Sequence, residues 1–335
     1  MHPGEPSALA HLISESDRLT YIDPHAALRL AESASQQAPS CGDTLLAIAA
    51  WRRYGTMLFA FGHIPDGQHA MFKALTIADA EDLVAERGEL IQDLASAYYT
   101  QGDYDEAIAY WADCIDTDGF TLNTRIHAYI GLGQVYYAHE RYEMALQNHL
   151  DAKALITAPF DTDLHCRVLI NLAADYAKLG RFDEVAHELD EALPLAEAAG
   201  NPEYVGEILV YRSAVALASG NTAEAHAFLD QAVAMRRVWA WGEISQNLAR
   251  GRVYLYENRL EEARASVSAA LARADEMGTC HKTFQAHHLL AQIYQRLGDT
   301  AQAEYYHRRY QEAFSRIVRS GTYAKLQALE ARLNH

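Results

Sequence analysis

Residues 94–111 alternate apolar, small and polar positions in the pattern of two short amphipathic helices. The pattern predicts one helix that ends at Gly102, a tight turn, and a second helix that starts at Tyr104. Small residues at Ala95 and Ala107 stand where the two helices must approach closely. The segment therefore predicts a helical hairpin.

The same pattern recurs at intervals of 38 to 40 residues along most of the chain. The turn glycine is replaced at two of these places, by Glu140 and by Asn258. The small residue in the middle of each first helix falls at Gly55, Ala95, Gly133, Ala173, Ser213, Gly251 and Ala291. Seven copies in phase resemble tetratricopeptide repeats, whose common period is about 34 residues, with about one extra helical turn per hairpin.

The resemblance implies an all-α fold, a right-handed superhelical α-solenoid of about seven hairpins with a period of about 40 residues. Residues 1–42 are predicted to form an N-terminal capping pair of helices, because they lack the glycine-aromatic turn. Residues 43–313 form the array in this interpretation, and residues 314–335 form a C-terminal linker and signalling helix. The last segment is predicted to break at Ser320 and Gly321.

The C-terminal segment carries Leu326, Leu329 and Leu333, spaced three and then four residues apart. This spacing is that of the a and d positions of a coiled coil, so the three leucines are predicted to line a dimer seam. The alternative is that the helix caps the last repeat.

The chain has 28 Lys and Arg against 45 Asp and Glu, a formal net charge of -17. This balance argues against a partner that is a nucleic acid, because a polyanion needs a basic face. The four cysteines form no CxxC pair, and neither a secretory signal nor an apolar stretch of membrane-spanning length is visible. We therefore expect a cytoplasmic protein with reduced thiols and no membrane partner.

Catalytic motifs are missing from the sequence, which shows no glycine-rich phosphate loop, HExxH or GxSxG pattern. We expect no catalytic residue and no cofactor in this chain. The densest group of metal-ligand residue types is Cys280, His281, His287 and His288. A transition-metal site needs three or four convergent ligands, so surface or groove histidines are the favoured interpretation and no metal site is predicted.

In tetratricopeptide arrays the first helices line a concave groove, and the resemblance implies that the same helices line one here. The groove is predicted to bind a peptide, a protein segment or a small ligand, because aromatic and arginine side chains supply most interface hot spots. The Lys and Asn clamp of tetratricopeptide co-chaperones is missing at the corresponding positions. The predicted lining is Arg52, Phe59, Gln92, Tyr99, Gln134, Tyr137, Arg167, Lys178, Arg252, Tyr256, His288, Gln292 and Arg296.

Roughly forty-residue hairpins also occur in bacterial regulators, including peptide-sensing quorum receptors and the sensory regions of certain diguanylate cyclases. Residues Tyr306–Glu312 and Leu326–Arg332 resemble the end of the array and the linker that feeds the cyclase domain. This resemblance implies a sensory region that controls a C-terminal cyclase output domain and dimerises through its last helix. The chain carries no GGDEF signature, so no cyclase residue is assigned. The alternative is a stand-alone adaptor or peptide receptor.

Overall fold

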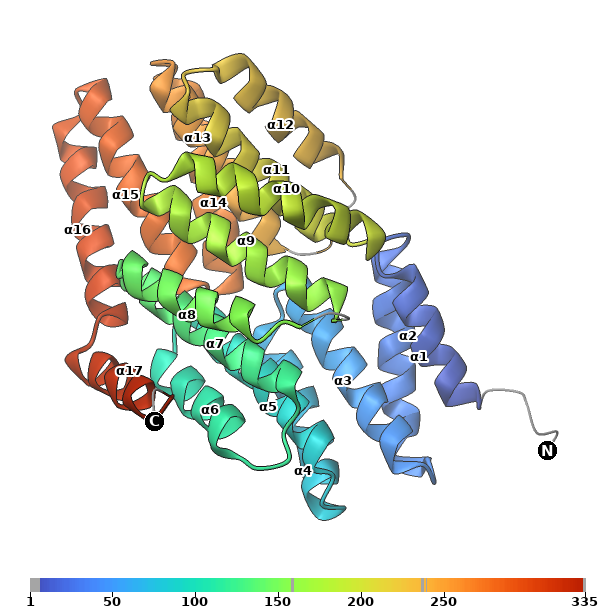
Figure 1. The fold of residues 1–335 in the computed structure, drawn as a ribbon. Helices are drawn as coiled ribbons and strands as arrows, with labels where there is room; N and C mark the ends of the chain where they lie inside the picture. The colour runs from blue at the N-terminus through green and yellow to red at the C-terminus, as the bar shows by residue number, and fades with distance from the viewer. Residues whose placement is uncertain (1–6, 158–159, 236–237, 239, 334–335) are drawn as a thin grey trace.

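The computed structural model describes residues 7–157, 160–235, 238 and 240–333. Every regular element within these ranges is helical, with 17 α-helices and one short 3-10 turn (Figure 1). The predicted all-α superhelical solenoid is confirmed. Seven helical hairpins follow an N-terminal pair of helices, and one more helix follows the last hairpin.

The N-terminal pair consists of α1 (Ala8–Leu19) and α2 (Pro24–Gln37), followed by the 3-10 turn η1 (Ala38–Ser40). The first helices of the hairpins are α3 (Thr44–Phe61), α5 (Val84–Gln101), α7 (Leu122–Ala138), α9 (Thr162–Lys178), α11 (Pro202–Ala218), α13 (Ala240–Tyr256) and α15 (Cys280–Leu297). Their partners are α4 (Ile64–Ala80), α6 (Tyr104–Asp116), α8 (Tyr142–Ala154), α10 (Phe182–Ala198), α12 (Thr222–Ala234), α14 (Leu260–Met277) and α16 (Thr300–Ile317). The final helix is α17 (Ser320–Leu333).

Short polar side chains start many of these helices. The carboxylate of Asp23 accepts a hydrogen bond from the Ala26 amide, with Pro24 in the first turn, and Asp161 caps α9 in the same way. Such caps satisfy amide groups that have no partner inside the helix. Glycine in the left-handed conformation ends α3 and α5, as the hairpin pattern predicts.

The two hairpin turns without glycine keep the glycine conformation. Glu140 has a φ of 56° and Asn258 a φ of 62°, both in the left-handed region. This region is disfavoured for residues with a Cβ, by about 1–2 kcal/mol for residues other than asparagine and aspartate. The turn geometry is therefore imposed by the packing of the two helices, and Glu140 adopts it at a cost.

Close helix packing explains the small residue in the middle of α7. A Cβ on Gly133 would lie 2.4 Å from Nε2 of His149, which is buried against it on α8. The same imidazole contacts a carboxylate oxygen of Asp175 at 2.5 Å through Nδ1 and the carbonyl oxygen of Ile130 at 3.1 Å through Nε2. The hairpin is therefore tied to α9 by a buried polar contact as well as by apolar packing.

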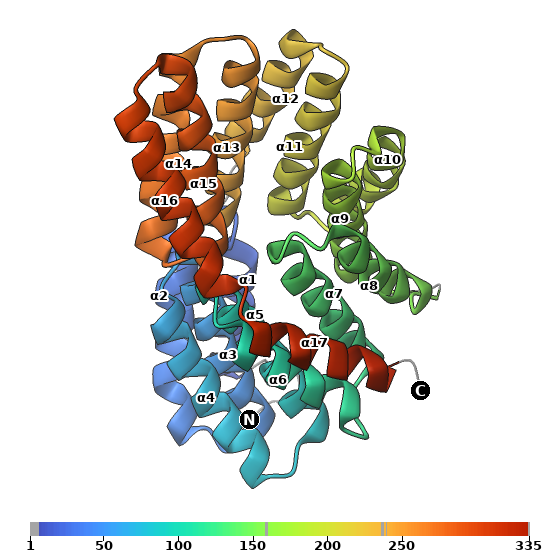
Figure 2. The same cartoon turned by 90° about the vertical axis from the view of Figure 1, so that its left-hand side faces the viewer.

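The superhelix brings its late repeats back to its early ones. The Cys280 thiol on α15 donates to the carbonyl oxygen of Gln101 on α5 at 3.1 Å. The Tyr21 hydroxyl, between α1 and α2, contacts Oδ1 of Asn201 at 3.3 Å. Figure 2 shows the lower ends of α13–α16 next to the upper ends of α1–α5. These contacts join the early and late repeats.

The last helix does not extend away from the array. The chain breaks after Ile317, two residues earlier than predicted, and α17 folds back across α6 and α7 (Figure 2). Leu326 and Leu329 are 0% and 2% exposed and pack into the core cluster of α6 and α7. Thr322 also donates to a carboxylate oxygen of Asp105 at 2.8 Å.

Leu326 and Leu329 are therefore not available to a dimer seam in this conformation, because both leucines are covered by their own chain. Dimerisation through this helix stays a prediction. The side chain of Leu333 lies outside the described residues. The alternative interpretation, a helix that caps the last repeat, does not match this packing, because α17 docks on α6 and α7 of the second and third hairpins.

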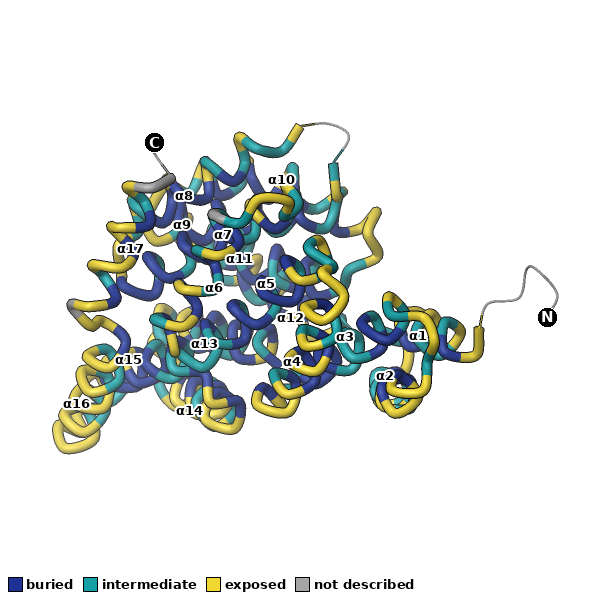
Figure 3. Tube along the Cα trace, turned by 90° about the horizontal axis from the view of Figure 1, so that it is seen from below, coloured by how far each residue is buried: buried dark blue, intermediate teal, exposed yellow. Residues whose placement is uncertain are grey.

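Burial follows the layered arrangement. Buried residues concentrate where neighbouring helices face each other, and the outer surfaces of α14 and α16 are largely exposed (Figure 3). Among the described helices, none is long and apolar enough to cross a membrane.

Candidate functional site

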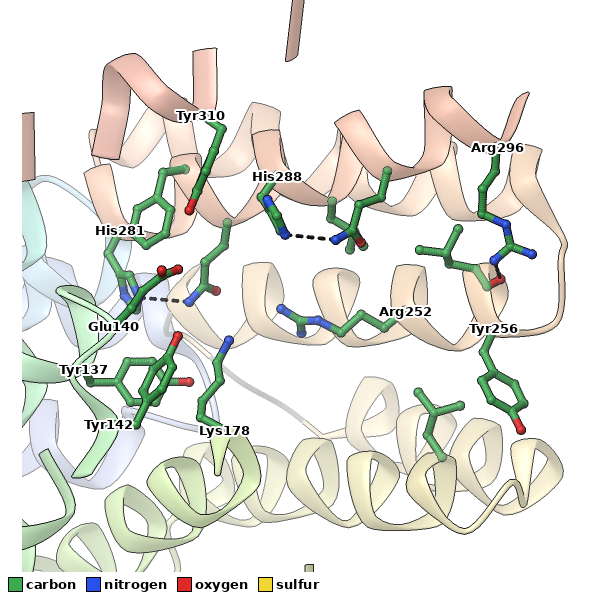
Figure 4. Close-up of a pocket in the computed structure, with 16 residues that line it drawn as sticks. Tyr137, Glu140, Tyr142, Lys178, Arg252, Tyr256, His281, His288, Arg296 and Tyr310 are labelled. Carbon is green, nitrogen blue, oxygen red and sulfur yellow. Dashed lines mark hydrogen bonds between the residues drawn. The ribbon is translucent and has the colours of Figure 1, made fainter. Parts of the chain in front are cut away.

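A cavity of about 480 Å³ lies on the concave side of the array, between the C-terminal parts of α7 and α9 and the helices α13 and α15 (Figure 4). The turn before α8, the first turn of α8, one residue of α11 and one residue of α16 complete its wall. Its lining combines aromatic, cationic and amide side chains with a few leucines. The residues are Tyr137, Glu140, Tyr142, Lys178, Leu217, Arg252, Leu255, Tyr256, His281, Phe284, Gln285, His288, Leu289, Gln292, Arg296 and Tyr310.

Two of the three Lys and Arg side chains in this lining lack a hydrogen-bonding partner among the described residues. Lys178 and Arg252 form no hydrogen bond or ion pair with any residue that the structure describes. Lys178 instead lies near the rings of Tyr137 and Tyr142, with its Nζ 5.8 and 5.6 Å from their centroids. Figure 4 shows both charged groups pointing into the cavity. A positive field is therefore left open at the centre of an acidic protein.

The pKa values of the two cations are lowered by this placement. Desolvation in the hollow, and then the charge of Arg252, lower the pKa of Lys178 to about 8, while Glu140 opposes the shift. Desolvation also lowers the pKa of Arg252. An anion bound between them would relieve both effects, because an opposite charge favours the charged form.

The turn residue Glu140 supplies the acidic side chain of this lining. Its carboxylate is directed into the cavity (Figure 4) from the strained turn between α7 and α8. Left-handed residues other than glycine concentrate at functional sites, where the side chain serves a purpose that offsets the strain. The negative charge of Glu140 therefore partly offsets the positive charge of the cavity.

Aromatic rings form one end of the cavity. Tyr137 and Tyr142 meet edge to face with centroids 5.3 Å apart. On the opposite wall, the Tyr310 ring lies 4.8 Å from His288 and 5.9 Å from Phe284. Such rings offer apolar surface with little loss of conformational entropy on binding.

Amide side chains on α15 fix two of the histidines. The Gln285 amide contacts Nε2 of His281, and the Gln292 amide contacts Nε2 of His288, both at 2.9 Å. An amide NH₂ can only donate, so in this arrangement each Nε2 accepts and the two imidazoles are neutral. Desolvation lowers the pKa of both histidines, in agreement with that state.

Seven of the predicted groove residues meet in this cavity. Among the cations of this set, Arg296 already has hydrogen-bonding partners. Its guanidinium donates to the Leu255 carbonyl oxygen at 2.6 Å and to Oδ1 of Asn258 at 2.8 Å. Arg296 thereby ties α15 to the turn after α13. The seven are Tyr137, Lys178, Arg252, Tyr256, His288, Gln292 and Arg296.

The other predicted groove cations have polar partners within the array. Nε of Arg52 donates to Asp93 at 2.7 Å, and its guanidinium also contacts Glu89. Nε of Arg167 donates to the Tyr204 hydroxyl at 2.8 Å. These side chains connect successive first helices and lie outside the cavity lining.

The remaining predicted positions serve packing or polar contacts within the array. The Phe59 ring fills the space beside Gly67 in its own hairpin, and Tyr99 is buried in the core where α5 meets α15. The Gln92 amide bonds Ser96 at 3.2 Å, and the Gln134 amide bonds Asn171 at 3.2 Å. None of these four belongs to the cavity lining.

Sequence reasoning missed Glu140, Tyr142 and Tyr310, which enter the cavity from a turn and from second helices. Tyr310 carried a signal, since it occupies a position that is small in the other hairpins. Its ring fills space between the cavity and Phe314, 5.8 Å away. For Glu140, the sequence feature that could have indicated a functional role is the replacement of the turn glycine by glutamate.

The histidine-rich region does not assemble ligands. Among the residues that the structure describes, no group of three or more His, Cys, Asp or Glu side chains is placed to hold a metal ion. His287 faces Tyr306, whereas His288 faces the cavity.

Comparison with known proteins agrees with this architecture. Sequence profiles of the tetratricopeptide repeat match residues 89–117, 164–237 and 285–304. No curated protein matches the chain.

Three solved structures show the similarity of fold. A Rap protein complexed with Competence and Sporulation Factor is 12% identical, with a TM-score of 0.59 over 92% of this chain and 75% of that one. The apo quorum sensor NprR from B. thuringiensis is 14% identical, with a TM-score of 0.56 over 92% and 87%. NprR in complex with its cognate peptide NprX is 13% identical, with a TM-score of 0.50 over 96% and 82%. At these identities the likeness concerns the fold.

Proposed function

We propose that this chain is a receptor that binds a short peptide or protein segment in the cavity between α7, α9, α13 and α15. The observation that carries the proposal is the pair of unpartnered cations, Lys178 and Arg252, among tyrosines in a solvent-open hollow. Both side chains remain exposed to solvent within the hollow, so their charges are available to an anionic group of a ligand.

The fold supports the same proposal. Two of the similar structures are complexes, one of a Rap protein with Competence and Sporulation Factor and one of NprR with its cognate peptide. A concave array of first helices offers an extended segment many side chains at regular spacing.

A display selection with random peptides tests this function. Immobilised wild-type protein should enrich a family of related peptides, and the variant Gln292→Trp should not, because the indole would fill the cavity. Gln295→Trp is the matched control, since Gln295 is exposed on the same helix and outside the lining. Enrichment that is equal on both variants would place binding elsewhere and overturn the proposal.

A second candidate is the sensory region of a cytoplasmic diguanylate cyclase, which rests on the resemblance of Tyr306–Glu312 and Leu326–Arg332 to the linker of such enzymes. In this candidate the peptide site would control the position of α17. Sequencing of the genomic locus decides it, because a GGDEF-encoding segment must follow codon 335 in the same reading frame.

A further inference from the structure

We infer that the ligand of this cavity is an acidic peptide, and that one of its carboxylates binds between the Lys178 ammonium and the Arg252 guanidinium. This inference rests on the proposed function and names the chemical class of its ligand.

Other arginines of the first helices differ from Lys178 and Arg252 in having acidic partners. Arg52 is neutralised by Asp93 and Glu89, at side-chain positions on the next first helix. Arg250, two residues from Arg252 on α13, pairs with Asp230 at 2.8 Å. The array thus has acidic partners available for its arginines and supplies none to Lys178 or Arg252 among the residues described.

The number and type of free cations in the lining indicate which anion binds there. Arginine presents a planar fork that suits a carboxylate or a phosphate, and lysine adds a point charge. Polyphosphates and nucleic acids need several free cations, whereas this lining offers two and includes Glu140. The chain as a whole has a net charge of -17, which repels a polyanion at longer range. One carboxylate matches the free charge.

The apolar and aromatic residues of the lining indicate what else the ligand carries. Leu217, Leu255 and Leu289 give the lining apolar surface, and Tyr137 and Tyr142 offer rings and hydroxyl groups near Lys178. A carboxylate alone would leave these surfaces uncovered. A peptide, which carries apolar side chains next to a carboxylate, covers them together.

Affinity selection from synthetic pentapeptide pools tests the inference. Four pools are used: acidic side chains with a free C-terminus, acidic side chains with an amidated C-terminus, neutral side chains with a free C-terminus, and neutral side chains with an amidated C-terminus. Wild-type protein should retain carboxylate-bearing peptides at least tenfold over the last pool. The two intermediate pools distinguish a side-chain carboxylate from a terminal one.

The variants Arg252→Gln and Lys178→Gln should each weaken binding of a retained peptide by roughly 10- to 100-fold, the range for a lost charged hydrogen bond. Arg250→Gln is the matched control and should leave affinity within about twofold, since its partner is Asp230. Circular dichroism melting of all three variants verifies that they fold.

The possible results distinguish failure of the proposed peptide receptor from failure of the proposed acidic ligand. Retention of no peptide from any pool would overturn the proposed function itself. Retention of neutral, amidated peptides with unchanged affinity for Arg252→Gln would overturn the acidic ligand and leave the peptide receptor. Inorganic triphosphate that binds more tightly than every retained peptide would also overturn it, in favour of a phosphate ligand.

Discussion

The thiol of Cys280 donates a hydrogen bond to the carbonyl oxygen of Gln101 at 3.1 Å, although 179 residues separate them along the chain. Cys280 begins α15, which contributes seven of the sixteen residues that line the cavity, and Gln101 ends α5 in the second hairpin. The contact therefore connects the early repeats to the wall of the site. The shape of the cavity depends on closure of the superhelix as well as on local packing.

Substitution of Gly102 tests this closure. Both Gly102 and Gly180 have positive φ, but a Cβ on Gly102 would also lie 2.7 Å from Cβ of Cys280, whereas a Cβ on Gly180 would meet nothing within 4 Å. Gly180→Ala should lower stability by about 1–2 kcal/mol through backbone strain. Gly102→Ala should lower it by roughly 1–3 kcal/mol more, through the displaced contact. Thermal unfolding of the two variants measures the difference, and equal melting temperatures would contradict the account.

A charge placed under α17 should release that helix from the array. Leu326→Glu would bury a carboxylate in the core of α6 and α7, which is unfavourable enough to detach a single helix. Trypsin should then cleave after Arg319 and Lys325 much faster than in wild-type protein. Gln327→Glu, on the exposed side of the same helix, is the control and should leave the rate unchanged. Equal cleavage of both variants would mean that α17 does not dock in solution.

The oligomeric state follows from the same packing. With Leu326 and Leu329 covered by their own chain, the helix offers no leucine seam at these positions, and light scattering should give the mass of one chain, 37.3 kDa. Leu326→Glu should not reduce this mass. A dimer that Leu326→Glu converts to a monomer would restore the coiled-coil hypothesis.

Binding of an acidic peptide should weaken with increasing pH. The free protein holds the pKa of Lys178 at about 8, and a bound carboxylate would raise it, so binding takes up a proton near pH 8. Affinity should therefore fall roughly five- to tenfold between pH 7 and pH 9. Titration calorimetry at several pH values measures this slope.

Other groups near the site also titrate, so the variant Lys178→Met is needed to show whether Lys178 causes the pH dependence of peptide affinity. The groups that carry or change charge close to Lys178 are Glu140, Arg252, His281, Lys282 and His288, and the pKa of Lys282 is lowered to about 7. Lys178→Met should bind more weakly and show a flat profile from pH 7 to pH 9. A slope that persists in this variant would assign the titration to another group.

Glu140→Gln should have the opposite effect to the cation variants. Removing this carboxylate deletes a like charge from the cavity, so an acidic peptide should bind roughly two- to tenfold more tightly. The backbone conformation should be unaffected, since glutamine has the same Cβ geometry. Competition against a labelled peptide measures the change, and weaker binding would show that Glu140 contacts the ligand favourably.

The hairpins could be predicted from the sequence because helix packing leaves a periodic trace, such as the small residues at Gly133 and Ala173. Which cations of the groove have partners, and which are free, could not be predicted from the sequence. Arg52 is neutralised by Asp93, 41 residues away, and Arg167 donates a hydrogen bond to the Tyr204 hydroxyl, 37 residues away. Only the register between helices brings these pairs together. Heptad-like leucines also cannot tell a coiled-coil seam from a helix face that docks on its own array.

Calorimetric titration of one selected acidic peptide into the wild-type protein, Arg252→Gln and Arg250→Gln tests the central claim most directly. The account predicts that Arg250→Gln binds like the wild type and that Arg252→Gln binds roughly 10- to 100-fold more weakly. Equal affinities in all three proteins would contradict it, and would show that the open positive charge of the cavity is not where the ligand binds.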